Sequence, residues 1–153
     1  MKFLADQMLG KLAKWLRFLG YDTSYPSVMT DDELIQLSKS ENRILLTRDR
    51  ELSKSNKKLK GVPGVIYIER DNSDLQLEQV LKSLDLKICD QILTRCAECN
   101  AKIAEVEKEQ VKGHVPEGVF DCQDTFWHCP NCDKYYWRGS HYDKILAKIE
   151  SLK

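Results

Sequence analysis

Two aspartates that closely follow short apolar runs are the first candidates for chemistry. Asp6 comes directly after the run at residues 3–5, and Asp49 comes shortly after the run at residues 44–46. Uninterrupted apolar runs of this length are typical of strands buried on both faces in parallel sheets. Sites in such sheets form outside the carboxyl ends of the strands. We therefore expect Asp6 and Asp49 to lie side by side, which is costly unless a cation lies between them.

A third carboxylate could come from the start of a predicted helix at residues 30–33, whose sequence TDDE is a capping box. The capping box leaves Asp31 and Asp32 unused. These two side chains either only favour the helix dipole, or one of them turns toward Asp6 and Asp49. A cluster made only of carboxylate oxygens suits Mg²⁺ or Mn²⁺ and not zinc.

Hydroxyl and basic side chains near these aspartates are of the types that hold a phosphodiester. A metal-bound water can be deprotonated near neutral pH and attack such a bond. Thr47 is placed to hydrogen-bond a carboxylate or that water. Cations that could hold the substrate's phosphates are Lys11, Arg17 and Arg48. Because Lys11, Lys14 and Arg17 are spaced three residues apart, they form either a phosphate-contacting face or an ordinary solvated face.

Two Cys-x-x-Cys pairs are the strongest local signal in the chain. They comprise Cys96 with Cys99 and Cys129 with Cys132. Four thiolates satisfy tetrahedral Zn²⁺ completely, so we expect a structural zinc site with no open position for catalysis. The interval between the pairs is longer than usual for a zinc ribbon, so residues 111–120 are expected to extend its inner hairpin.

Two cysteines and one histidine remain after this assignment. We expect Cys89 and Cys122 to be small buried side chains. His128 adjoins Cys129 and is an alternative zinc ligand, although four cysteines make it unnecessary.

Residues 135–141 are dense in aromatic and basic side chains. Aromatic rings interleaved with Arg and His can stack on nucleic-acid bases. The alternative is that these rings form the core of the ribbon, because so small a module has little else to bury. Under either interpretation, Arg138 and His141 are expected to be more exposed than Trp137.

The composition excludes several classes of protein. The chain has 153 residues, of which 42% are hydrophobic and 31% charged, and its 24 basic residues balance 24 acidic ones. Nucleic-acid binding must therefore come from local patches and not from a global charge excess. We expect a cytoplasmic protein without a secretory leader or membrane span, in which cysteines bind metal more often than they form disulfides.

The order of elements predicts the fold class. Strands are expected at residues 2–5, 21–25, 44–46 and 65–68, and helices at residues 8–20, 30–42, 50–60 and 73–84. This alternation is typical of an α/β fold with a doubly wound parallel sheet. A weak strand at residues 91–93, the zinc ribbon and a helix at residues 142–152 follow. We therefore expect two domains, at residues 1–88 and 89–153.

These motifs together resemble a known family, the PIN-like ribonucleases, and more narrowly the Mut-seven carboxy-terminal RNAse family with its zinc ribbon. The segments that carry the resemblance are residues 3–6 (FLAD), 8–17 (MLGKLAKWLR), 44–52 (ILLTRDREL), 124–132 (DTFWHCPNC) and 136–141 (YWRGSH). The resemblance implies a PIN-like fold and a Mg²⁺- or Mn²⁺-dependent RNase. Its acidic positions fall on Asp6, Asp31 and Asp49, with Asp32 the alternative to Asp31. Neither Glu69 nor Asp71 is a clear match to a fourth acid.

Three functional hypotheses follow. The first is a metal-dependent endoribonuclease acting on RNA. The second is a non-catalytic RNA- or ribosome-binding module, which the missing fourth acid favours. The third, a phospho-receiver domain, needs a lysine at a late strand end, and residues 66–69 contain none.

Overall fold

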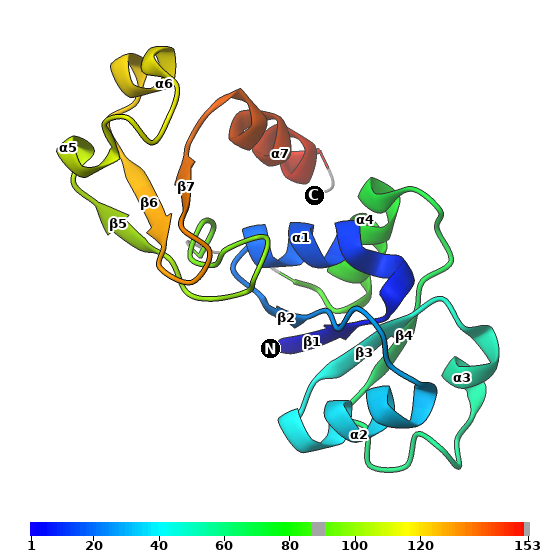
Figure 1. Cartoon of the computed structure of the whole chain (residues 1–153). Helices are drawn as coiled ribbons and strands as arrows, with labels where there is room; N and C mark the ends of the chain where they lie inside the picture. The colour runs from blue at the N-terminus through cyan, green and yellow to red at the C-terminus, as the bar shows by residue number, and fades with distance from the viewer. Residues whose placement is uncertain (87–90, 152–153) are drawn as a thin grey trace.

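The computed structural model describes residues 1–86 and 91–151, and its first part is an α/β unit built on a parallel sheet (Figure 1). The sheet has four strands in the order β2-β1-β3-β4, and every pairing is parallel. In chain order the elements of this unit are β1 (Lys2–Ala5), the 3-10 helix η1 (Gln7–Leu9), α1 (Gly10–Phe18), β2 (Asp22–Ser24), α2 (Asp31–Glu41), β3 (Ile44–Thr47), α3 (Arg50–Lys54), β4 (Val65–Tyr67) and α4 (Ser73–Ser83). The predicted fold class is confirmed.

The strand order reverses between β1 and β3. The chain leaves β1 through α1 to β2 on one side, and then returns through α2 to β3 on the other side of β1. Ala5, the last residue of β1, is paired with Leu46 of β3. The carboxyl ends of β1 and β3 therefore meet at a topological switch point, the usual place for a site in an open α/β sheet.

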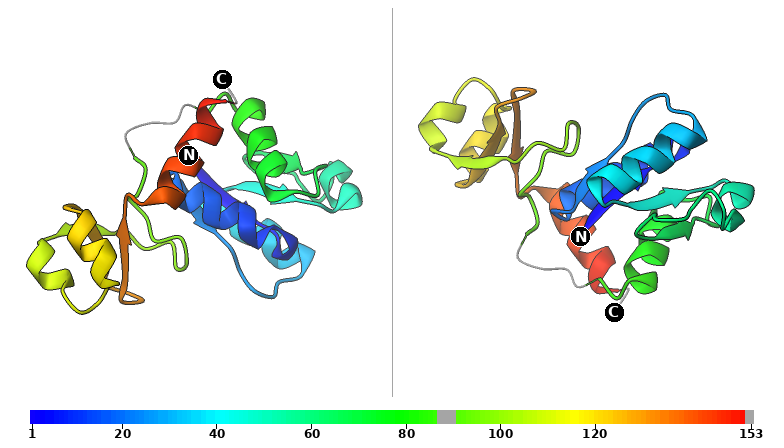
Figure 2. Two further views of the ribbon diagram at one scale, coloured as in Figure 1. Left: turned by 90° about the horizontal axis from the view of Figure 1, so that it is seen from above. Right: turned by 90° about the horizontal axis from the view of Figure 1, so that it is seen from below.

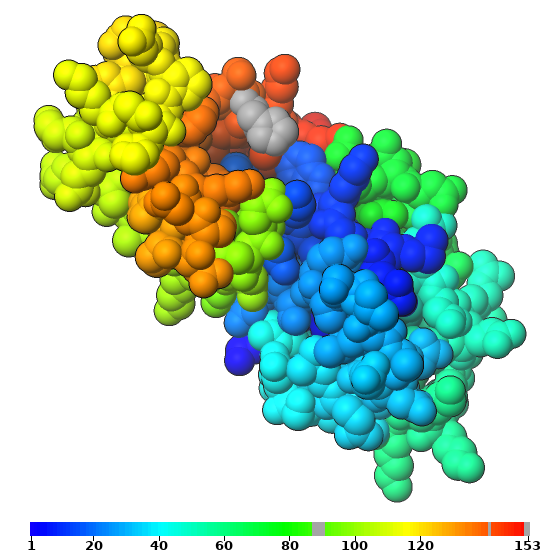
Figure 3. Space-filling model, viewed as in Figure 1, coloured from blue at the N-terminus to red at the C-terminus, as the bar shows by residue number. Residues whose placement is uncertain are grey.

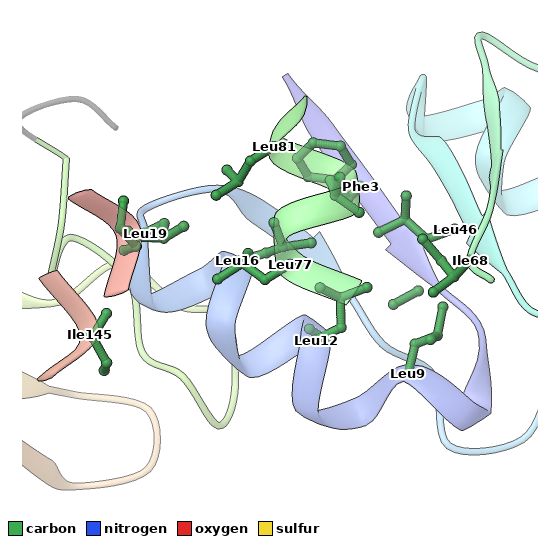
Figure 4. Close-up of a cluster of buried hydrophobic side chains, with 14 residues drawn as sticks. Phe3, Leu9, Leu12, Leu16, Leu19, Leu46, Ile68, Leu77, Leu81 and Ile145 are labelled. Carbon is green, nitrogen blue, oxygen red and sulfur yellow. The ribbon is translucent and has the colours of Figure 1, made fainter. Parts of the chain in front are cut away.

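Helices cover both faces of the sheet, which explains the unbroken apolar runs in its strands. Phe3 and Ala5 pack in a core with α1 and α4, whereas Leu4 packs in a second core with α2 and α3 (Figure 4 shows the first core). Successive side chains of a strand point to opposite faces, so both faces require apolar residues. Each fully buried leucine of this kind contributes about 1.5–3 kcal/mol.

Local sequence signals begin or end several helices as expected. The N–H of Glu33 donates to the Thr30 hydroxyl at 3.3 Å and the N–H of Thr30 donates to the Glu33 carboxylate at 2.8 Å, which confirms the capping box of α2. Asn42 ends α2 in a left-handed conformation with φ of 54°. Gly20 follows α1 with φ of 89°, and a Cβ there would lie 2.3 Å from the Gln91 carbonyl oxygen, so only glycine fits this contact.

Three expectations about local structure are wrong. The helix predicted at residues 50–60 ends at Lys54, because the lysine-rich remainder offers little apolar surface to pack. Residues 73–76 (SDLQ) predict a capping box with Ser73 as the N-cap, but the N-cap of α4 is Asn72, whose side chain accepts from the N–H of Asp74. Residues 91–93 form a turn and not a strand, and Leu93 has φ of 61°.

The second part of the chain is a three-stranded antiparallel ribbon in the order β5-β6-β7, with a terminal helix. Its elements are β5 (Ala104–Val106), α5 (Lys108–Val111), α6 (Glu117–Cys122), β6 (Phe126–Cys129), β7 (Lys134–Trp137) and α7 (Ser140–Glu150). The short helices α5 and α6 occupy the predicted extension between β5 and β6. Figure 3 shows the ribbon at one end of an elongated molecule and the α/β unit at the other.

The helix α7 returns from the ribbon to the α/β unit (Figure 2). Its buried side chains Ile145 and Ile149 belong to the same core as those of α1 and α4. The first core is thus completed by residues from the end of the chain, and the division at residue 88 stays a prediction from sequence. Across the described ranges, no helix is both long and apolar enough to cross a membrane.

The ribbon is hydrogen-bonded to the edge strand β2. The N–H of Thr23 donates to the Asn100 side-chain oxygen at 3.0 Å, and the Asn100 amide donates to the Asp22 carboxylate at 2.8 Å. The Arg43 guanidinium donates to that carboxylate at 2.7 Å, and Arg95 lies 3.5 Å from it. Burial opposes the ionised Asp22, but the hydrogen bonds from Arg43 and Asn100 outweigh burial and lower the pKa of this carboxyl.

We predict that Asp22→Asn destabilises the protein by about 2 kcal/mol, because asparagine keeps an acceptor but loses the charge that faces two guanidinium groups. Urea unfolding at pH 7 measures the change. The carboxylate stabilises the fold above the unfolded-state pKa of about 3.9 and this contribution is lost as pH falls through the lowered folded-state pKa. The difference between the two proteins should therefore shrink below about pH 4.

The exposed residue Asp121 provides a matched control. Asp121→Asn should unfold as the unmodified protein does at every pH. Equal stability of the Asp22→Asn protein at pH 7 would contradict the role given to this carboxylate.

Candidate functional site

The four cysteines of the two Cys-x-x-Cys pairs gather in one cluster. Their sulfur atoms all lie within 4.8 Å of one another. The separations are 3.3 Å for Cys96–Cys132, 3.5 Å for Cys99–Cys129, 3.5 Å for Cys129–Cys132 and 3.8 Å for Cys99–Cys132. A tetrahedral zinc site with Zn–S bonds of about 2.3 Å has sulfurs about 3.8 Å apart. The cluster therefore has the ligand chemistry and the dimensions of a structural zinc site, as predicted.

Backbone geometry at both pairs turns the sulfurs toward one another. The N–H of Cys96 donates to the Ala101 carbonyl at 2.8 Å, and the N–H of Asp133 donates to the Cys129 carbonyl at 2.9 Å. Asn100 and Asp133, which follow the second cysteine of each pair, are left-handed with φ of 66° and 55°. Asn and Asp adopt this conformation more readily than most residues, so the sequence itself favours both turns.

The surroundings of two of the thiols shift their pKa values in opposite directions. Burial opposes the thiolate of Cys99, but hydrogen bonds from Asn131 and the Ala101 backbone lower its pKa to about 6. Burial and the neighbouring thiols raise the pKa of Cys132. Four thiols this close cannot all ionise without a compensating charge, and a divalent cation would supply that charge.

The structure places two of the three side chains that remain after the cysteine assignment. His128 is hydrogen-bonded to Asp133 at 2.6 Å and lies outside the cluster, so the four cysteines suffice. The expectation of a buried Cys122 is wrong, because Cys122 is exposed on α6, a short helix with no buried residue. Cys89 lies outside the described residues.

A second candidate site lies at the switch point between β1 and β3. The buried Thr47 hydroxyl donates to one Asp6 carboxylate oxygen at 2.9 Å and accepts from the N–H of Asp49 at 3.0 Å. The other Asp6 oxygen accepts from the N–H of Gln7 at 2.7 Å. The Asp49 side chain accepts from the N–H of Leu52 at 2.9 Å and so caps α3. The Thr47 hydroxyl thus contacts the carboxylate of Asp6 and the backbone of Asp49, and the catalytic roles of these three residues stay predictions.

The predicted third aspartate is not gathered with these two. Asp31 and Asp32 are exposed in the first turn of α2, the helix that follows the neighbouring strand β2. In residues 1–86 and 91–151, the only group of three or more His, Cys, Asp or Glu side chains placed to hold a metal is the four-cysteine cluster. A metal held by Asp6, Asp49 and Asp31 or Asp32 stays a prediction.

The candidates for a fourth acid follow β4. Asp71 forms an ion pair with Arg48, which is one of the predicted phosphate-binding cations. Glu69 is exposed, and its backbone N–H donates to the Gln79 side chain at 3.1 Å. The positive charge of Arg48 is therefore already paired with the carboxylate of Asp71.

The predicted basic face of α1 is divided by the ribbon. Lys11 is exposed, and Lys14 forms an ion pair with Glu98 at 2.8 Å. Arg17 is only 5% exposed, so its prediction as a phosphate-binding residue is wrong. Its guanidinium donates to the carbonyl oxygens of Thr23 at 2.8 Å, Ala97 at 3.1 Å and Glu98 at 2.8 Å. Residues 97 and 98 lie between the first two cysteines, so the ribbon covers this end of α1.

The basic residues near the end of β7 differ from each other. Arg138 is exposed and lies over the rings of Trp127 and Tyr142, at 5.5 Å and 5.4 Å from their centroids. The side chain of His141 lies outside the described residues. The predicted role of both residues in substrate binding stays a prediction.

The fold and the cysteine cluster define an α/β protein with an appended zinc-ribbon module. A family model described as the Mut7-C RNAse domain matches residues 1–149, so the chain belongs to the Mut7-C RNAse domain family. The membership confirms the resemblance seen in the sequence and indicates a nuclease role connected with RNA. No curated protein and no solved structure matches the chain significantly.

We predict that Cys96→Ser lowers zinc affinity by more than about tenfold, because serine replaces one of four thiolate ligands of the cluster. The ribbon should then lose order, since metal binding provides much of the folding free energy of so small a module. Zinc content per chain, measured by mass spectrometry of the purified protein, provides the test.

Cys122→Ser is the matched control, because Cys122 is exposed and outside the cluster. It should retain one zinc ion per chain. Full zinc content in the Cys96→Ser protein would refute the assignment.

Proposed function

We propose that this protein is a metal-dependent endoribonuclease that hydrolyses RNA phosphodiester bonds at the Asp6–Thr47–Asp49 site. The observation that carries the proposal is that the Thr47 hydroxyl contacts both the Asp6 carboxylate and the backbone N–H of Asp49 at the switch point of the sheet. The membership of residues 1–149 in an RNAse domain family supports RNA as the substrate.

The donor set suits Mg²⁺ or Mn²⁺. Asp6 and Asp49 offer carboxylate oxygens, which are the ligands these ions prefer, and Mg²⁺ keeps several waters, so a few monodentate aspartates suffice. Asp31, or Asp32 in its place, is the proposed third ligand. When bound, the ion would supply Lewis-acid activation of water and charge neutralisation at the phosphodiester.

The residues of the chain itself hold and orient the reacting groups. Thr47 donates to Asp6 and so fixes the rotation of that carboxylate, while the backbone N–H of Asp49 in turn orients the threonine hydroxyl. Lys11 lies in the first turn of α1, which begins four residues after Asp6, and its exposed ammonium can contact a phosphate beside the site. Arg48 can do so only at the expense of its ion pair with Asp71.

A second candidate function is a non-catalytic RNA- or ribosome-binding module. The observation that favours it is the absence, in the described part of the chain, of a third acidic side chain gathered beside Asp6 and Asp49. Such a module would bind RNA through its basic and aromatic surface and would not require Mg²⁺ at Asp49.

We predict that Asp49→Asn abolishes cleavage of a mixed RNA substrate in the presence of Mn²⁺. Asparagine retains an oxygen that can cap α3, so the fold should change in stability by less than about 1 kcal/mol. The unmodified protein should be stabilised by Mg²⁺ through mass action, by about 2.7 kcal/mol at one hundred times the dissociation constant, and the variant should not. Gel-based cleavage and thermal unfolding with and without Mg²⁺ provide the two measurements.

Glu51→Gln is the matched control, because it neutralises an exposed carboxylate in the first turn of the same helix α3. This protein should cleave RNA and respond to Mg²⁺ normally. Cleavage by the Asp49→Asn protein with unchanged metal dependence would refute the catalytic site. RNA binding by the unmodified protein without cleavage or Mg²⁺ stabilisation would favour the binding module.

A further inference from the structure

A cavity of about 680 Å³ lies between α1 on one side and β7 and α7 on the other. These elements come from opposite ends of the chain and lie side by side in Figures 1 and 2. The walls carry six aromatic side chains, which are Trp15, Phe18, Tyr135, Tyr136, Trp137 and Tyr142. Two of the three tryptophans of the chain therefore line one cavity.

Core packing does not account for all of these rings. The ribbon has a core of its own around Leu93, Ile103 and the cysteines, against which Tyr136 and Tyr142 pack. Trp15 is half-buried against the first core, and Tyr135 is stacked on His114, whereas Trp137 belongs to none of the three hydrophobic clusters formed by the described residues. Within residues 135–141, Tyr136 therefore belongs to the core of the ribbon, as one interpretation predicts. Trp137 lies outside the core clusters and is the ring for which binding to a nucleic-acid base stays open.

The position of Trp137 depends on a neighbouring glycine. A Cβ on Gly139 would lie 2.9 Å from the indole nitrogen of Trp137, which is closer than real Cβ contacts. Gly139 therefore leaves the space that the indole occupies at the wall of the cavity. The local sequence thus accommodates a half-buried tryptophan at this place.

The rim of the cavity is positively charged. Lys11 and Lys14 line the cavity from α1, and Glu98, the acidic residue among those lining it, belongs to the ribbon. Glu98 is paired with Lys14 at 2.8 Å and with Lys134 at 3.5 Å, and the hydrogen bond from Lys14 is the main cause of its lowered pKa. Two lysines and one carboxylate thus line the cavity, so its lining has a small net positive charge that suits phosphate groups.

The cavity begins close to the proposed active site. Lys11 is in the first turn of α1, and α1 follows Asp6 directly through η1. From Lys11 to Phe18 the helix rises by about 10 Å, so the aromatic wall extends away from the strand-end site along α1. A bound strand that enters at Lys11 would have its next phosphodiester near Asp6.

We propose that this cavity binds single-stranded RNA by stacking bases on Trp137 and Trp15, with Lys11 and Lys14 near the phosphates. Stacking on aromatic rings within a positively charged groove is the usual way in which proteins hold single strands without strict sequence preference. The proposal deepens the proposed function, because the cavity would guide an unpaired strand to the Asp6–Thr47–Asp49 site. A base-paired strand has its bases already stacked and should not enter.

Tryptophan fluorescence tests this proposal directly. The full-length zinc-containing protein with Asp49→Asn, which prevents cleavage, is titrated with a single-stranded oligouridylate of about ten nucleotides. The RNA should quench tryptophan emission, and Trp137→Ala should weaken binding by roughly fivefold or more. A duplex of the same length should quench far less.

Trp127→Phe is the matched control, because Trp127 does not line the cavity. This protein should keep the affinity of its parent and still be quenched by RNA, whereas the double variant Trp15→Phe, Trp137→Phe should lose the quenching. Zinc content and melting temperature confirm that each variant is folded, and Trp137→Leu, which is apolar but has no ring to stack on a base, replaces Trp137→Ala if the latter unfolds.

The possible outcomes distinguish a failure of the cavity proposal from a failure of the proposed function. Equal RNA affinity in the folded Trp137→Ala protein and its parent would overturn the cavity proposal even if the unmodified protein cleaves RNA. Quenching that depends on Trp137, in a protein that cleaves no RNA, would support the cavity and reject the nuclease. A concentration-dependent dimer that Trp137→Ala disrupts and RNA does not affect would identify the cavity as a contact between copies and overturn the proposal.

Discussion

The buried guanidinium of Arg17 is the interaction on which the arrangement of the two parts depends. It donates to a carbonyl of the edge strand β2 and to two carbonyls between the first pair of cysteines. Burial lowers the pKa of Arg17, and the nearby Cys96 and Cys99 sulfurs oppose that effect. A buried cation is costly unless it is fully paired, so this position holds the ribbon and the α/β unit in one orientation.

The docking of the ribbon also protects the edge of the parallel sheet. An exposed edge strand presents unpaired backbone groups that can pair with another chain. Here Asn100 accepts from the N–H of Thr23, and Asp22 binds Arg43 and Asn100 beside it. Since Asn100 follows the first cysteine pair directly, order at the four-cysteine cluster and protection of β2 are expected to depend on each other.

The strand-end site is built in a different way, from short-range contacts within one sheet. Asp6 and Thr47 lie on neighbouring strands, and Asp49 is fixed as the N-cap of α3. Each aspartate therefore has a structural hydrogen bond of its own, and Asp49 remains exposed. The hydrogen bonds thus fix one side of this residue group to the sheet, while Asp49 faces solvent, and its catalytic use belongs to the proposed function.

Features that depend on local pattern were determined by the sequence alone. The unbroken apolar runs indicate burial on both faces, the two Cys-x-x-Cys pairs predict one four-thiol cluster, and the TDDE segment caps α2, since each signal is a short motif or a run of apolar residues. Asp6 and Asp49 could also be placed in advance, because parallel strands bring their carboxyl ends to one edge.

Only the tertiary structure shows that Arg17 is buried, that α7 returns to the first core and that an aromatic cavity forms. The ribbon carbonyls that bind Arg17 lie 80 and 81 residues away in the chain, and no periodicity predicts such a contact. On its own helix, Arg17 is indistinguishable from the exposed Lys11 and Lys14. Arg17 differs from the two lysines because the ribbon covers its end of α1 and removes it from water. The position of the ribbon follows from the packing of the whole chain.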